Sequence, residues 1–184
     1  MRLHSLLSML IFLSIAGYGQ SDHYLSGRAY MANEMYDSAL YHLEKALEQH
    51  PGEADIYYQL GISYFHTDHF PNARDAFYET EIRRKGMGSF YLAKSEIRLH
   101  HHQQALKYLR IHLSSRYKRP ESEILLDEDI SSLDGLPGWQ QIWNEKRWYS
   151  DGDKLFQEAM YLNEQGDYLE AINMLNNLEK QGYK

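Results

Sequence analysis

Apolar residues along this chain recur at intervals of three, four and seven, the spacing that gathers them on one face of an α-helix. Residues 20–53 contain two such stripes. The first consists of Tyr24, Gly27, Tyr30 and Met31, and the second of Ala39, Leu43, Ala46 and Leu47. A polar stretch at 33–37 separates the stripes, and Pro51-Gly52 follows the second, where it stops a helix. The pattern predicts two helices joined by a tight turn.

The same stripes return at a fixed period. Gly27, Tyr30 and Ala39 recur as Gly61, Tyr64 and Ala73, each pair 34 positions apart. We predict further hairpins over residues 54–85, 86–115 and 151–184. The residues expected to pack where helices cross are Gly27, Tyr30, Ala39, Ala46, Gly61, Tyr64, Ala73, Ala93, Ala105, Ala159 and Ala171. A period of this length predicts an all-α solenoid of stacked hairpins.

These residues resemble the tetratricopeptide repeat family, whose pattern has Leu-Gly, Tyr and Ala at fixed positions of each repeat. The first unit matches it at Gly27, Tyr30, Ala39, Leu43, Ala46 and Pro51, and the second at Tyr57, Leu60, Gly61, Tyr64, Ala73 and Phe77. The third unit departs from it at Glu96 and His112. The resemblance implies a right-handed superhelix of hairpins and the non-catalytic binding of another protein or peptide.

Residues 116–150 interrupt the period. A basic turn at 116–120 precedes the acidic stretch 121–134, and a predicted helix beginning near Pro137 places Trp139, Ile142 and Trp143 on one face. Asp127 and Asp129 resemble the start of a calcium loop, but the Gly and Glu that such a loop requires are absent. We therefore interpret 121–134 as a solvated acidic surface, within a partly helical connector that packs on the stack.

The first 19 residues differ from the rest. Arg2 precedes an apolar run from Leu6 to Ile15, and small residues precede Gln20. This order predicts a signal peptide, because the run is shorter than the about 20 residues of a membrane span. We expect export to the periplasm or the outside of a bacterial cell, without stable membrane insertion of the mature chain. A retained N-terminal anchor is the alternative.

Composition narrows the possible functions. The net charge is -7 and no basic block occurs, so nothing indicates nucleic-acid binding. The chain contains no cysteine, which excludes disulfides and a thiol nucleophile. Nucleophile-elbow, phosphate-loop and dinucleotide motifs are also absent from the sequence. We therefore expect neither an enzyme nor a cofactor.

Histidines in two predicted turns raise a further alternative. Stacked repeats bring equivalent turns together, so zinc or copper could find ligands among His66, His69, His100, His101 and His102. No cysteine accompanies them, and ligand type alone does not define a metal site. We predict no metal site, with an exported metal-handling protein as the second alternative function.

The first helix of each unit carries the predicted binding residues. In the tetratricopeptide family, four positions of this helix line a concave groove. Carried over to this chain, the resemblance implies a peptide-binding groove made of Tyr24, Arg28, Met31, Tyr58, Ile62, Phe65, Phe90, Lys94, Ile97 and Arg98, with His66 beside them. Apolar side chains interspersed with cations suit a peptide that has apolar anchors and acidic character. Packing between repeats is the competing role for several of these aromatic side chains.

The last predicted helix carries apolar residues that one neighbour cannot cover, namely Leu169, Ile172, Leu175 and Leu178. Arrays of this type close with a polar outer face. Residues 151–184 are therefore either the start of a further array or a surface for a partner. Self-association of the chain through this helix, as a homo-oligomeric structural module, is the first alternative function.

Overall fold

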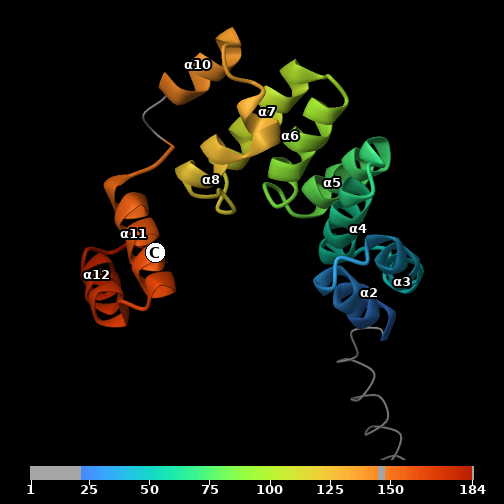
Figure 1. Ribbon diagram of the computed structural model, residues 1–184, viewed down its shortest axis with the longest axis horizontal. Helices are drawn as coiled ribbons and strands as arrows, with labels where there is room; N and C mark the ends of the chain where they lie inside the picture. Colours follow the sequence, from blue (N-terminus) through green and yellow to red (C-terminus); the bar gives the residue numbers. More distant parts are fainter. Residues whose placement is uncertain (1–21, 145–147, 184) are drawn as a thin grey trace, which may run out of the picture.

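The computed structural model describes residues 22–144 and 148–183, and every regular element within them is an α-helix (Figure 1). Three hairpins come first: α2 (Asp22–Ala32) with α3 (Tyr36–Gln49), α4 (Ala54–His66) with α5 (Phe70–Arg83), and α6 (Ser89–Arg98) with α7 (His102–Leu113). The shorter helices α8 (Glu121–Leu126), α9 (Glu128–Ser131) and α10 (Pro137–Asn144) follow, and α11 (Asp151–Gln165) with α12 (Tyr168–Lys180) forms the last hairpin. The predicted signal peptide lies outside the described residues.

The two helices of a hairpin approach each other closely at glycine. A Cβ atom added to Gly27 would lie 2.7 Å from Cγ of Leu43, and one added to Gly61 would lie 2.6 Å from Cε1 of Phe77. Any larger residue would therefore have to displace the Leu43 or Phe77 side chain or push the helices apart. The alanines of the repeat are fully buried at the same crossings, at 0–1% exposure: Ala39, Ala46, Ala73, Ala93, Ala105, Ala159 and Ala171. Tyr30 and Tyr64 are half-buried beside them.

Consecutive hairpins stack, and the stack curves. Helix α3 packs on α4 and α5 packs on α6, as a solenoid requires. The first helices of the hairpins also contact one another, α2 with α4 and α4 with α6, whereas α3, α5 and α7 make no such contacts. The first helices thus form the inner side of the curve. The predicted all-α solenoid of helical hairpins is confirmed.

The connector covers the end of the three-hairpin array. Helix α10 packs on α7, so closely that a Cβ atom on Gly138 would lie 2.7 Å from Cδ1 of Leu106. Ile124, Ile130 and Ile142 of the connector are fully buried in one cluster with residues of α6 and α7. This packing gives the last hairpin of the array the apolar cover that a further repeat would otherwise supply.

The C-terminal hairpin stands apart from the array in Figure 1, and among the described helices α11 and α12 pack only on each other. Gly166 ends α11 in a left-handed conformation, with φ of 91°. Phe156, Leu169 and Ile172 are exposed at 40%, 81% and 54%, whereas Leu178 is buried, so the apolar surface predicted for α12 is present only in part. Among the described helices, none has the length and apolar character that a membrane span requires.

Candidate protein-binding face

The candidate site is the inner face of the array, formed by the ten predicted groove residues of α2, α4 and α6. The structure divides them by exposure. Four are buried between helices, namely Tyr24, Phe65, Phe90 and Ile97; Met31, Tyr58, Ile62 and Lys94 are half-buried, and Arg28 and Arg98 are exposed. The buried four hold the array together, so the accessible part of this face is smaller than the sequence indicates.

On the inner face, contacts between aromatic rings connect α4 with α6. Tyr91 stacks on Phe77 at 5.3 Å between ring centres, and Phe65 and Tyr58 meet Tyr91 edge-on at 5.8 and 6.2 Å. Burial raises the pKa of Tyr58, so its hydroxyl stays neutral and available as a hydrogen-bond donor. Such edge-to-face pairs are rigid, and they fix the positions of the polar groups above them.

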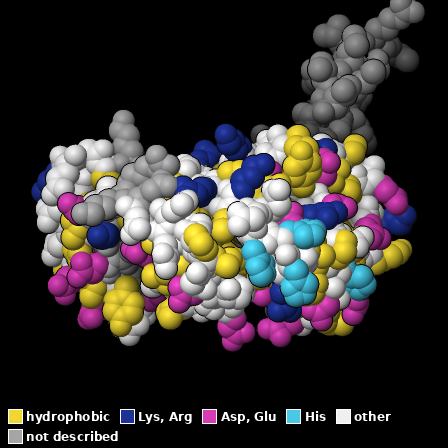
Figure 2. Space-filling view, turned by 90° about the horizontal axis from the view of Figure 1, so that it is seen from above, with side chains coloured by type: hydrophobic (Ala, Val, Ile, Leu, Met, Phe, Trp, Pro, Cys, Tyr) yellow, Lys and Arg dark blue, Asp and Glu magenta, His cyan; other side chains and the backbone are white. Residues whose placement is uncertain are grey.

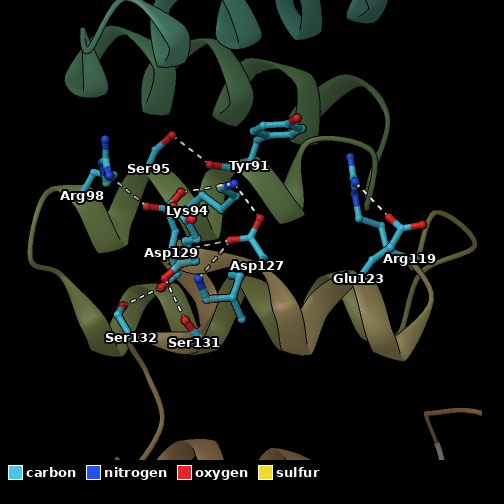
Figure 3. Close-up of polar contacts among 12 residues, drawn as sticks. Tyr91, Lys94, Ser95, Arg98, Arg119, Glu123, Asp127, Asp129, Ser131 and Ser132 are labelled. Carbon is cyan, nitrogen blue, oxygen red and sulfur yellow. Dashed lines mark hydrogen bonds and ion pairs between the residues drawn. The ribbon is translucent and has the colours of Figure 1, made fainter.

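Lys94 is the charged centre of the α6 part of the face. Its Nζ lies 2.7 Å from Asp127 and 3.2 Å from Asp129, and the side chain is only 14% exposed (Figure 3). The ammonium also lies 5.3 Å from the ring centre of Phe65 and 5.6 Å from that of Tyr91. Two carboxylates and three aromatic rings, the third being Phe90 at 5.7 Å, thus surround one cation in a place that water reaches poorly.

The carboxylates come from the chain's own connector, which runs along the inner side of α6. Arg119 lies over Phe90 at one end of this helix, at 4.5 Å from the ring centre. At the other end, Arg98 contacts Asp129 at 3.2 Å and Asp68 at 3.6 Å. Helix α9 packs on α6 between these points. A segment of polypeptide therefore already occupies this third of the face.

The interpretation of residues 121–134 as a solvated acidic surface is wrong for its central part. The side chains of Asp127 and Asp129 are only 16% and 13% exposed, and Asp127 also accepts hydrogen bonds from the backbone N–H groups of Asp129 and Ile130. The sequence did contain an indication of these ion pairs, because it predicted Lys94 and Arg98 on the inner face. The fold was needed to bring a segment about 30 residues away onto them.

His112 of α7 forms a hydrogen bond that links the connector to the array. It is 2% exposed, and its Nε2 accepts a hydrogen bond of 3.0 Å from the backbone N–H of Arg119. The ring is therefore neutral, with its proton on Nδ1. Burial, assisted by the nearby Arg119 charge, lowers the pKa of His112 to about 4.

Histidine side chains gather on the face shown in Figure 2. His66 is stacked on Tyr36 at 4.4 Å, His69 contacts the hydroxyl of Thr67, and His101 contacts the carboxylate of Glu96 at 2.8 Å. His100, His101 and His102 line a shallow open depression at the α6–α7 turn. In the described part of the chain, no three His, Asp or Glu side chains are placed to hold a metal ion.

Comparison with known proteins agrees with this architecture. Residues 27–67 match the family model described as TPR repeat. A solved structure of MamA AMB-1 resembles the chain with a TM-score of 0.51 at 21% identity, over 62% of this chain and 64% of that one. The match spans less than two thirds of the MamA chain, and at this identity it concerns the fold alone. No curated protein matches the sequence.

The hairpins, their stacking and the family match define a helical-repeat scaffold of the kind that mediates protein interactions. Residues 27–67 carry the match to the tetratricopeptide repeat, and the hairpin array around them has the architecture of such repeats.

Proposed function

We propose that this chain is a non-catalytic scaffold of the bacterial cell envelope, which holds a segment of a partner protein on the α2–α4 part of its inner face. One observation carries the proposal. The α6 part of the same face already holds a polypeptide segment, residues 119–130, through aromatic and cationic side chains. The residues available to a partner at α2 and α4 are Arg28, Met31, Tyr58 and Ile62, which present apolar surface beside one cation.

Site-specific photocrosslinking tests this function. A photoreactive amino acid replaces Ile62 on the inner face, and a matched control replaces Tyr78, which is exposed on α5 on the outer side. In the native host, the Ile62 variant is expected to give discrete protein adducts that the Tyr78 variant does not give. Equal adducts from both positions would contradict binding on the inner face.

The envelope location rests on the N-terminal segment and has a separate test. Cell fractionation is expected to place the mature chain in the periplasm or the medium, with Gln20 as its first residue by mass spectrometry. A cytoplasmic chain that retains Met1 would contradict export.

Self-association is the second candidate, because α11 and α12 expose apolar side chains that no described helix covers. Leu169 and Ile172 are the most exposed aliphatic side chains on α12. If this surface joins two copies, sedimentation shows a dimer that the double variant Leu169→Glu, Ile172→Glu converts to a monomer. A monomer at all concentrations would exclude it.

A further inference from the structure

Helices α2 and α6 present the same pair of residues at equivalent repeat positions. Each has an aromatic residue followed four positions later by a cation: Tyr24 and Arg28 on α2, Phe90 and Lys94 on α6. The geometries match, since Cζ of Arg28 lies 6.0 Å from the ring centre of Tyr24 and Nζ of Lys94 lies 5.7 Å from that of Phe90. Helix α4 has Ile62 at the position of the cation.

The α6 pair shows what such a position binds. Asp127 and Asp129 place their carboxylates on Lys94, and the next residue, Ile130, is fully buried against the array. The bound element is thus a short acidic turn in which an aliphatic side chain follows two carboxylates. Charge and apolar contact act together there, because the carboxylates orient the turn and the isoleucine excludes water.

The α2 pair, Tyr24 and Arg28, also combines an aromatic ring with a cation, but no carboxylate of the described residues is paired with this cation. Arg28 is exposed, and no Asp or Glu of residues 22–144 or 148–183 forms an ion pair with it. Met31 on α2 and Ile62 on α4 are half-buried, and the two helices contact each other, so both residues can supply apolar surface on this face. A guanidinium can also bind a carboxylate through two parallel hydrogen bonds, which an ammonium cannot.

We propose that residues 127–130 are an internal copy of the partner's recognition element. The partner segment, on this view, is an acidic turn of the form Asp-x-Asp followed by an aliphatic residue, with its carboxylates on Arg28 and its aliphatic side chain against Met31 and Ile62. This inference rests on the proposed function and specifies the chemistry of the ligand. The connector itself remains in place, because its buried isoleucines belong to the core of the array.

A peptide taken from the chain provides the probe. Fluorescein-labelled LLDEDISSLD, the sequence of residues 125–134, is titrated with the full-length mature chain and followed by fluorescence anisotropy. Saturable binding is expected, and Arg28→Glu is expected to weaken it roughly ten-fold or more by replacing attraction with repulsion. Lys107→Glu, an exposed cation on the outer helix α7, is the matched control and should leave the affinity unchanged.

The peptide with Asn in place of Asp127 and Asp129 should not bind, and circular dichroism should show that Arg28→Glu remains folded. Three results would overturn the inference: no binding to the wild-type chain, equal binding to Arg28→Glu, or binding that Lys94→Glu removes and Arg28→Glu does not. The last would mean that the peptide exchanges with the connector on α6. In each case the crosslinking experiment at Ile62 still tests the proposed function independently.

Discussion

The buried His112 makes the stability of the array depend on pH. In the folded protein its pKa is about 4, against 6.5 for the free side chain. Between these values the unfolded chain binds a proton at His112 and the folded chain does not. The contribution of neutral His112 to the free energy of unfolding is therefore fully present above pH 6.5 and is lost as the pH falls toward 4. One pKa unit corresponds to about 1.4 kcal/mol, so the total loss is about 3 kcal/mol.

The loss can be worked out at intermediate pH. From the two pKa values, linkage gives a destabilisation of roughly 1 kcal/mol at pH 5.5 and roughly 2–3 kcal/mol at pH 4.5, relative to neutral pH. The physical reason is local. A proton on Nε2 would point at the backbone N–H of Arg119, which donates to that atom in the neutral state, and the hydrogen bond that fastens the connector would be lost.

His112→Gln is the variant that isolates this effect. Glutamine can still accept a hydrogen bond from Arg119 but does not titrate. Urea unfolding is followed by tryptophan fluorescence, because Trp139, Trp143 and Trp148 all belong to or pack on the cluster that contains the connector. As the pH falls, the free energy of unfolding of the wild type should decrease, relative to that of the variant, by the amounts given above. A difference between the two proteins that does not change from pH 7.5 to 4.5 would refute the reasoning.

Three further predictions concern packing and ion pairs. Lys94→Met leaves the half-buried Asp127 without a cation and Asp129 with Arg98 alone, and it should lower the free energy of unfolding by about 1–3 kcal/mol. Lys45→Met removes the solvent-exposed pair with Glu48 and should have a much smaller effect. Equal losses in urea titrations would contradict the role of Lys94. Gly61→Leu must displace the Phe77 ring and should lower the free energy of unfolding by about 1–3 kcal/mol or more. Gly52→Leu is the control and should lower it little, because a Cβ atom added to Gly52 meets no atom within 4 Å. Thermal melts that cannot distinguish the two variants would refute the close helix crossing at Gly61. Burial alone would raise the pKa of Asp153, but hydrogen bonds from Ser150, Lys118 and Tyr183 lower it to about 2. Lys118→Met should therefore raise the pKa of Asp153 measurably in an NMR titration. An unchanged pKa would show that Lys118 does not hold the C-terminal hairpin in solution.

The repeat could be recognised from the sequence because its determinants are local. Gly27 and Gly61 stand 34 positions apart at helix crossings where an added Cβ would meet Leu43 and Phe77, and the same facing helices carry the buried Ala39 and Ala73. Periodic small residues of this kind encode the hairpin within one unit, and the stacking of units follows from repetition. The third unit keeps this packing at Ala93 and Ala105 although its loops differ in length.

The accessible surface could not be predicted in the same way. Position in the repeat placed Phe90 and Lys94 on the inner face, but whether a partner can reach them depends on what else packs there. The segment that covers them begins more than 20 residues after Lys94 and has no repeat pattern of its own. Likewise, the buried state of His112 depends on the connector folding back over α6.

The sequence by itself thus determined the helices, their pairing and the residues at each crossing, because these follow from spacing along one or two adjacent helices. Only the tertiary structure decided which part of the inner face is open and which cation of that face forms no ion pair with a carboxylate of residues 22–144 or 148–183. The physical reason is that ion pairs and burial depend on distances in space, and in this chain an irregular connector sets those distances for Lys94, Arg98 and Arg119.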